Sequence, residues 1–153
     1  MTIEIGQEAP DFELPSGGGD PVRLSSFRGT SAVAVVFYPF TFTGVCEGEL
    51  CQLRDDLGDF EAAGVQVLAI SCDSRHSQRV WAEQQGFGFP VLSDFWPHGA
   101  TAQAYGVFDD ALGCAVRTTF LVDRDGVVVD TFGTDGLGTP REASRYAEAV
   151  GRL

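Results

Sequence analysis

The amino-acid sequence predicts an α/β domain built on a mixed β-sheet. Two continuous runs of β-branched and aromatic residues, Ala32–Tyr38 and Val65–Ile70, are typical of strands buried on both faces. A helical pattern separates them, and strand and helix patterns then alternate to the end of the chain. The length of 153 residues is that of one domain, so we expect residues 1–153 to fold as one unit.

The first elements follow from local patterns. Strand patterns at Asp11–Leu14 and Val22–Leu24 flank the loose segment Gly17–Asp20, which predicts an N-terminal hairpin. The strand at Ala32–Tyr38 comes next, and then a helix. The apolar residues of this helix recur three or four positions apart, at Leu50, Leu53, Leu57 and Phe60.

The second half of the chain continues the alternation. A helix is expected over Ser74–Gln85, a short strand at Pro90–Leu92 and another helix near Ala100–Tyr105. The segments Arg117–Val122 and Val127–Phe132 have strand patterns and are separated by an Asp-Arg-Asp-Gly turn, which predicts a hairpin.

A last helix is expected to open at Pro140. Proline is favoured at the first helical position, and Thr139 before it is a suitable N-cap. Glu142 then takes the capping-box position, three residues after the cap.

Composition excludes several classes of function. Lys and Arg total 10 against 22 Asp and Glu, which gives a formal charge of −12 at pH 7. All the basic residues are arginine, so no lysine can form a Schiff base or serve a P-loop. Nucleic acids and anionic membranes attract clustered cations, and we expect neither as a partner.

The expected compartment follows from the N-terminus and the cysteines. Met1–Ile5 is neither basic nor long and apolar, and no apolar run reaches about 18 residues, so we expect no signal peptide, no membrane helix and a cytoplasmic location. Structural disulfides are rare in that reducing compartment. Each of the four cysteines is therefore expected to be either a buried apolar residue or a reactive thiol.

Cys46 is the candidate for chemistry. It falls in the first turn of the helix after the first buried strand, where unpaired N–H groups and the helix dipole favour a thiolate. Thr43 is placed to cap this helix or to hydrogen-bond a substrate beside the sulfur, and Pro39 fixes the turn off the strand. The alternative is a buried structural cysteine, with Thr43 as an ordinary N-cap.

The pattern Pro-x-x-x-Thr-x-x-Cys that ends at Cys46 resembles the active-site signature of peroxiredoxins, which are thiol peroxidases with a thioredoxin-like fold. The segments Gly6–Phe12, Leu24–Gly29 and Arg117–Asp123 also resemble segments of that family. The resemblance spans nearly the whole chain. It implies a thioredoxin-like fold and a thiol peroxidase that needs no metal, haem or flavin cofactor.

The resemblance also implies which residues act. Pro39, Thr43, Cys46 and Arg117 match the four residues that define the family's site. The Cys46 thiolate would cleave the O–O bond of hydrogen peroxide, an organic hydroperoxide or peroxynitrite, while Thr43 and Arg117 hold the peroxide and stabilise negative charge. The product is a sulfenic acid. Glu49, one turn beyond Cys46, is expected either to pair with an arginine and fix it, or to be solvated.

Two rival functions use the same residues. A thiol–disulfide oxidoreductase would act on protein disulfides through Cys46 and Cys51, and a redox sensor would pass oxidation from Cys46 to a partner protein. The absence of a Cys-x-x-Cys pair argues against a thioredoxin-type activity.

Cys51 is the first candidate to resolve the sulfenic acid. The Cys-x4-Cys spacing resembles the peroxiredoxin subgroup related to bacterioferritin comigratory protein, in which the second cysteine resolves the first. In a helix, residues five apart have Cα atoms about 8.6 Å apart, beyond the ~7 Å limit for a disulfide. Resolution by Cys51 would therefore require the helix to unwind locally. On the helical wheel Cys51 points away from the apolar stripe, toward Arg54 and Asp55.

An external reductant is the second candidate. Phe42–Cys46 and Leu92–Ala100 resemble the alkyl hydroperoxide reductase E subgroup of actinobacteria, which is usually described as having one active cysteine. That resemblance implies reduction by thioredoxin, mycoredoxin or a low-molecular-weight thiol. Cys72 and Cys114 are the remaining internal candidates, although Cys72 at a strand end is better explained as a buried apolar residue.

Several other residues are expected to have no catalytic role. His76 and His98 cannot form a metal site by themselves. Four aromatic residues in predicted loops near the site pack ordinarily, form an apolar collar for alkyl hydroperoxides, or belong to a dimer interface. We expect a homodimer, as is common in the family. These aromatic residues are Phe40, Phe42, Phe95 and Trp96.

Overall fold

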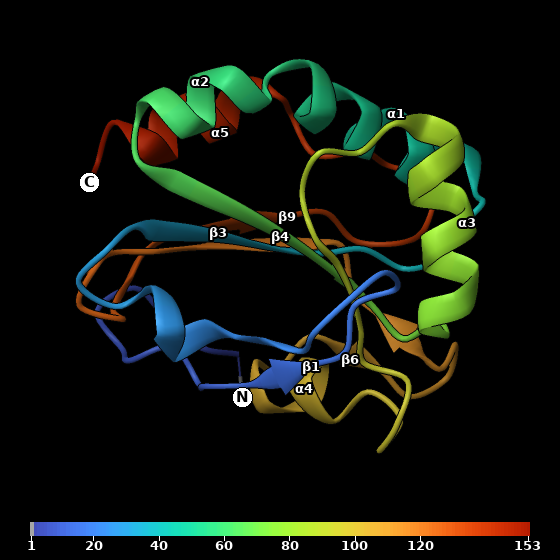
Figure 1. The fold of residues 1–153 in the computed structure, drawn as a ribbon. Helices are drawn as coiled ribbons and strands as arrows, with labels where there is room; N and C mark the ends of the chain where they lie inside the picture. Colours follow the sequence, from blue (N-terminus) through green and yellow to red (C-terminus); the bar gives the residue numbers. More distant parts are fainter. Residues whose placement is uncertain (1) are drawn as a thin grey trace.

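The computed structural model describes residues 2–153, and its centre is a five-stranded mixed sheet (Figure 1). The strand order is β5-β4-β3-β8-β9. β3, β4 and β5 run parallel, whereas β8 is antiparallel to both β3 and β9. The strands are β3 (Ala32–Phe37), β4 (Val65–Ser71), β5 (Val91–Ser93), β8 (Thr118–Val122) and β9 (Val128–Gly133).

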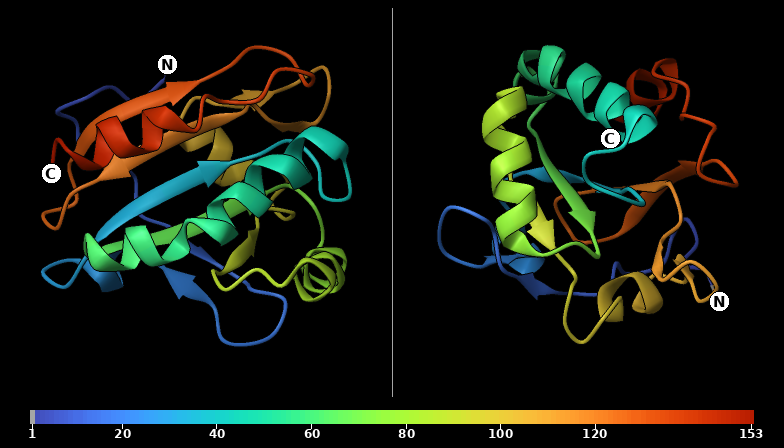
Figure 2. Two further views of the ribbon diagram at one scale, coloured as in Figure 1. Left: turned by 90° about the horizontal axis from the view of Figure 1, so that it is seen from above. Right: turned by 90° about the vertical axis from the view of Figure 1, so that its right-hand side faces the viewer.

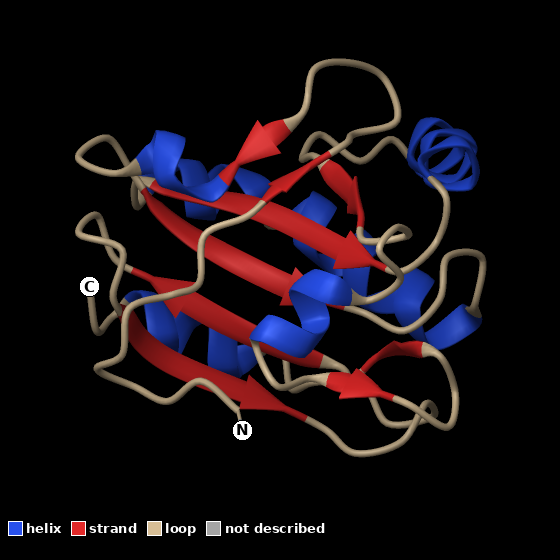
Figure 3. Cartoon of the chain, turned by 90° about the horizontal axis from the view of Figure 1, so that it is seen from below, coloured by secondary structure: helices blue, strands red, loops and turns tan. Residues whose placement is uncertain are grey.

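Helices cover the sheet unequally. One face carries α1 (Gly44–Asp55), α2 (Leu57–Ala62) and α5 (Ser144–Val150), with α3 (Arg75–Gln85) at the side of the same layer (Figures 1 and 2). The other face carries α4 (Ala100–Ala104) and the N-terminal segments (Figure 3). Within residues 2–153, no helix is both long enough and apolar enough to cross a membrane.

The remaining elements are short. β1 (Glu13–Leu14) and β2 (Val22–Arg23) pair as the predicted N-terminal hairpin, and the 3-10 helix η1 (Leu24–Phe27) follows. β6 (Phe108–Asp109) pairs with β7 (Cys114–Ala115) in a second small hairpin.

β3 lies between two apolar cores. Because successive side chains of a strand point to opposite faces, Val33, Val35 and Phe37 join the core under α4 and the N-terminal segments. Ala34 and Val36 join the core under α1, α2, α3 and α5. The uninterrupted apolar run in the sequence is thus the signature of a strand covered on both faces, as predicted.

The predicted elements are present, with four differences. The single helix predicted to reach Leu57 and Phe60 is divided at Asp56 into α1 and α2. Leu24 begins a 3-10 turn instead of ending a strand. Cys114 lies in β7, a two-residue strand that no local sequence pattern predicts. The last helix begins at Ser144 and not at Pro140, so the predicted capping box with Glu142 does not form. The physical reason for this late start is the position of Arg141, which a buried carboxylate holds outside the helix.

Candidate active site

Cys46 lies in the first turn of α1, as the sequence predicts. The helix begins at Gly44, so Cys46 is its third residue, and it is 1% exposed. It joins the apolar core with Leu50 and Leu53, on the face that the helical spacing predicts. The sulfur therefore lies near the positive end of the helix dipole and is shielded from bulk water.

The start of α1 has free backbone donors. The first helical hydrogen bond runs from the N–H of Glu47 to the carbonyl of Thr43, at 2.8 Å. The preceding N–H groups, those of Gly44, Val45 and Cys46, have no acceptor within residues 2–153. Free N–H groups at a helix terminus can hold an anion or a developing negative charge.

The turn from β3 into α1 has a constrained backbone. Pro39 is buried just after the strand. Phe42 has a φ of 66°, the one positive φ at a non-glycine residue in the described part of the chain. The Thr43 hydroxyl donates to the carbonyl of Phe40 at 2.7 Å, so it does not cap α1 with its side chain. The expected side-chain cap is therefore absent, and the hydroxyl oxygen keeps its capacity to accept a hydrogen bond.

Glu49 binds two buried arginines. Its Oε1 accepts a hydrogen bond from Nη1 of Arg117. Arg141 donates from Nε to Oε2 at 2.9 Å and from Nη2 to Oε1 at 3.0 Å. Burial alone would raise the pKa of Glu49, but the hydrogen bonds and charge of Arg141, with the charge of Arg117, hold it below its usual range. The ionised carboxylate thus anchors both guanidinium groups one turn beyond Cys46.

Sheet pairing places Arg117 beside the strand that leads to Cys46. Arg117 precedes β8, whose Thr118 pairs with Phe37 at the end of β3. Its Nη2 donates to the carbonyl of Leu137 at 2.8 Å. Its Nε is buried and has no acceptor within residues 2–153. An unpartnered donor on a fixed guanidinium is suited to bind a substrate oxygen.

Comparison with known proteins identifies the family. A profile of the AhpC/TSA family matches residues 5–131. The chain is 50% identical over 126 residues to alkyl hydroperoxide reductase E of Mycobacterium tuberculosis, with 82% of each chain covered. This chain is a peroxiredoxin. It is accordingly an oxidoreductase that reduces peroxides at the expense of thiols, and neither rival function is favoured.

Other relatives agree with this assignment. The peroxiredoxin is 34% identical to the putative peroxiredoxin bcp of Coxiella burnetii, over the full length of both chains. Its structure superposes on peroxidoxin BcpB of Mycobacterium tuberculosis with a TM-score of 0.85 and 31% identity, covering 98% and 96% of the two chains. For AhpC of Enterococcus faecalis the TM-score is 0.87 at 28% identity, covering 99% and 92%. The thioredoxin-like fold and both subgroup resemblances are thus confirmed.

The other cysteines of the peroxiredoxin differ in environment. All four are free thiols. Burial raises the pKa of Cys72 to about 12 and that of Cys114 to about 11, and nearby aspartates add to both shifts. Cys51 is half-buried, and its Sγ lies 3.5 Å from Oε1 of Gln85 in α3. Cys51 is not part of the apolar core of α1, as the helical wheel predicts, and the end of α3 packs against it.

Loop residues also take the expected places. Phe42, Phe95 and Trp96 are exposed, Trp96 by 82%, whereas Phe40 is half-buried. His98 lies in an exposed turn between the carbonyls of Phe95 and Gly113. His76 is exposed in the first turn of α3.

Within residues 2–153, no group of three or more His, Cys, Asp or Glu side chains could hold a metal ion.

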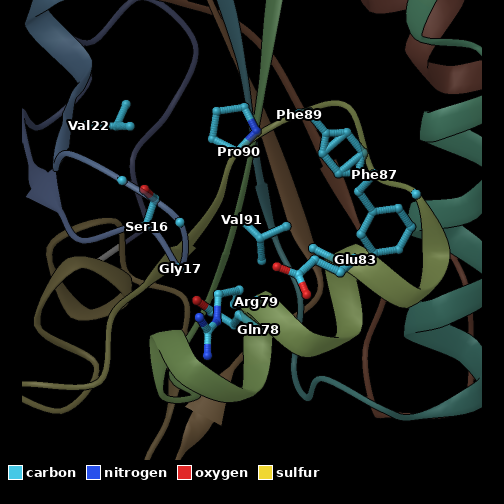
Figure 4. A pocket seen from close by; sticks show the side chains of 14 residues that line it. Ser16, Gly17, Val22, Gln78, Arg79, Glu83, Phe87, Phe89, Pro90 and Val91 are labelled. Atoms are coloured by element: carbon cyan, nitrogen blue, oxygen red, sulfur yellow. The ribbon is translucent and has the colours of Figure 1, made fainter.

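A groove of about 590 Å³ lies away from this site, between α3, β5 and the Gly-rich turn (Figure 4). Phe87, Phe89 and Val91 form its apolar wall, and Arg79 and Glu83 lie at its rim. None of the four cysteines lines it.

Arg141 is the residue that sequence reasoning missed. Its guanidinium also donates from Nη1 to the carbonyl of Phe37 at 2.8 Å and to Oγ1 of Thr119 at 3.1 Å. Local sequence favours a helix start here, and its partner Glu49 lies 92 residues away. The only local signal was the presence of an arginine in a chain that has few cations.

Proposed function

We propose that Cys46 is the peroxidatic nucleophile of this peroxiredoxin. The observation that carries the proposal is that free N–H groups lie at the start of α1, beside Cys46, while Glu49 one turn further along anchors the guanidinium of Arg117. Thr43 is the further acceptor for a peroxide O–H, and Pro39 holds the turn. Glu49 positions Arg117 and does not touch the substrate.

The first step is a displacement at a peroxide oxygen by the thiolate of Cys46. The Cys46 thiolate attacks one peroxide oxygen, and the S–O bond forms as the O–O bond breaks. The sulfur is oxidised to sulfenic acid, while the departing oxygen leaves as hydroxide or alkoxide, which takes a proton to become water or an alcohol, or leaves within nitrite when the substrate is peroxynitrite. The N–H groups and Arg117 stabilise negative charge on the oxygens during this step. Hydrogen peroxide, organic hydroperoxides and peroxynitrite are the substrates proposed.

A thiol then resolves the sulfenic acid. We propose Cys51 as the internal resolver, which forms a Cys46–Cys51 disulfide and water. An external thiol, from a thioredoxin, a mycoredoxin or a low-molecular-weight thiol, is the second candidate, and it would form a mixed disulfide first. Mass spectrometry of the wild type after one equivalent of peroxide separates them: an internal disulfide supports Cys51, whereas a persistent sulfenic acid requires the external thiol.

We also propose that residues 1–153 form one peroxiredoxin domain that works as a cytoplasmic homodimer. One domain is supported by the two cores, which share β3. The dimer is supported by exposed Phe42, Phe95 and Trp96, which follow the carboxyl ends of the parallel strands β3 and β5 and so lie at one edge of the sheet. Sedimentation of the wild type and of Trp96→Asp tests the dimer, which the substitution should dissociate.

Stopped-flow kinetics tests the nucleophile. Reduced wild type should react with hydrogen peroxide far faster than free cysteine does, and Cys46→Ser should lose that reaction completely. Cys72→Ser is the matched control, and it should retain the wild-type rate because Cys72 stays protonated. A wild-type rate no faster than that of free cysteine, or a Cys46→Ser variant with undiminished rate, would overturn the proposal.

A further inference from the structure

Opening of the first turn of α1 is required after Cys46 is oxidised. Cys46 is 1% exposed, so an external thiol cannot reach its sulfur while the turn is folded. Cys51 cannot reach it either, because positions five residues apart in a helix are too far apart for a disulfide. The contacts that hold this turn closed therefore bear on either route of resolution.

One carboxylate fastens the turn to α3. Glu47, the residue after Cys46, accepts two hydrogen bonds at the same Oε1. Trp81 donates from Nε1 at 3.0 Å, and Gln85 donates from Nε2 at 2.9 Å. Trp81 is fully buried, so this attachment is made to a fixed part of α3.

The same two residues of α3 hold both sides of the turn. The Trp81 ring packs against Phe42, just before α1, with ring centroids 6.2 Å apart. The Gln85 amide reaches further along α1, where its Oε1 accepts from Sγ of Cys51 at 3.5 Å. Gln85 thus bonds the residue next to the nucleophile and the candidate resolving thiol with one side chain.

We propose that Glu47, Trp81 and Gln85 form a clamp that sets how fast the turn bearing Cys46 opens for resolution. With the clamp closed, Cys46 stays in the geometry that reacts with peroxide. Release of Gln85 frees the first turn of α1 and the Cys51 thiol together. The three are positioning residues, and the proposal rests on Cys46 as the peroxidatic cysteine.

Loss of the clamp should affect the first turn of α1 alone, and not the stability of the whole helix. Glu47 is hydrogen-bonded to α3, and no hydrogen bond or ion pair joins it to Arg117 or Arg141. Its loss should therefore loosen the turn without moving Arg117. A hydrogen bond to a charged group is strong enough that its loss changes an opening equilibrium by about tenfold or more.

Hydrogen exchange of the reduced protein tests the clamp without any peroxide chemistry. Glu47→Ala should speed exchange of the first hydrogen-bonded amides of α1, those of residues 47–50, about tenfold, while amides of β3 and β4 keep wild-type protection. Glu47→Gln retains an acceptor but not the charge, so its exchange rate should lie between those of the wild type and Glu47→Ala. Glu61→Ala, an exposed residue of α2, is the matched control and should match the wild type. Unchanged exchange over residues 47–50 in Glu47→Ala would overturn the proposal.

Resolution kinetics gives the functional result. After one equivalent of peroxide, in the presence of a fixed excess of dithiothreitol as the external thiol, the sulfenic acid of Glu47→Ala and Gln85→Ala should disappear about tenfold faster than that of the wild type. Gln84→Ala, the exposed neighbour on α3, should not differ from wild type. Trp81→Phe keeps the ring and removes the donor, and it should behave like Gln85→Ala. Rates of resolution within twofold of the wild-type rate in all three clamp variants would contradict the clamp.

Failure of the wild type to form sulfenic acid would instead contradict the role of Cys46.

Discussion

Arg141 binds both carboxylate oxygens of Glu49, although 92 residues separate the two in the chain. This ion pair fixes the carboxylate that holds Arg117, so it connects the C-terminal segment to the peroxide site. The pair is buried on all sides, and neither partner can be removed without leaving an uncompensated charge.

Arg141→Gln should be both less stable and slower. Breaking a buried ion pair from one side costs about 3–5 kcal/mol, so the free energy of unfolding should fall by roughly that amount. The rate of peroxide reduction should also fall, because Glu49 and Arg117 lose their fixed orientation. Urea unfolding and stopped-flow kinetics measure the two effects. Arg75→Gln, an exposed arginine without an ion pair in residues 2–153, should show neither.

Arg117→Gln should slow the peroxide reaction by about 10²–10³-fold, the usual effect of losing one donor that stabilises developing negative charge. The buried Nε and Nη groups have no substitute at that position. The second-order rate constant with hydrogen peroxide, measured for folded variant and wild type, decides the point. A variant that keeps the wild-type rate would show that Arg117 does not contact the peroxide.

Acid should weaken the Glu49 network. Because the folded-state pKa of Glu49 lies below its ordinary value of 4.5, its contribution to stability is present above that value and is lost as the pH falls through the lower, folded-state pKa. Glu49→Gln should therefore lose less stability than the wild type between pH 5 and pH 3, although it starts from a lower value at pH 7. Denaturant unfolding at several pH values measures how the free energy of unfolding of each protein changes with pH. An equal change in the two proteins would contradict an ionised, ion-paired Glu49.

Cys72 and Cys114 should be unreactive toward alkylating reagents. Burial raises the pKa of Cys72 to about 12 and that of Cys114 to about 11, so both remain protonated at pH 8. Brief treatment of the reduced protein with iodoacetamide should leave these two unmodified. Peptide mapping by mass spectrometry checks this, and rapid labelling of either one would contradict its assignment as a protonated, buried thiol.

Much of the fold was predictable because long apolar runs mark buried strands. Ala32–Phe37 is covered on both faces, and that alone produces its uninterrupted apolar pattern. The hairpin of Phe108–Asp109 with Cys114–Ala115 escaped prediction because two-residue strands are too short to show a period. The last helix begins late because the bonds between Arg141 and Glu49 outweigh the local preference for a capped start at Pro140.

The candidate site was predictable where its residues are close in sequence. Pro39, Thr43 and Cys46 share one turn, and their spacing reflects a strand that ends and a helix that begins. Arg141 and the attachment of Glu47 to Trp81 depend on contacts between distant segments, which no local pattern records. The helical wheel gave the correct direction for Cys51 but could not show that α3 covers that direction.

The most direct test locates the first oxygen atom transferred from peroxide. Reduced Cys51→Ser protein is mixed with one equivalent of hydrogen peroxide, trapped with a sulfenic-acid reagent, digested and mapped by mass spectrometry. We predict one trapped sulfenic acid per chain, on Cys46, with Cys72 and Cys114 unmodified. Trapping on another cysteine, with Cys46 still reduced, would contradict the central assignment.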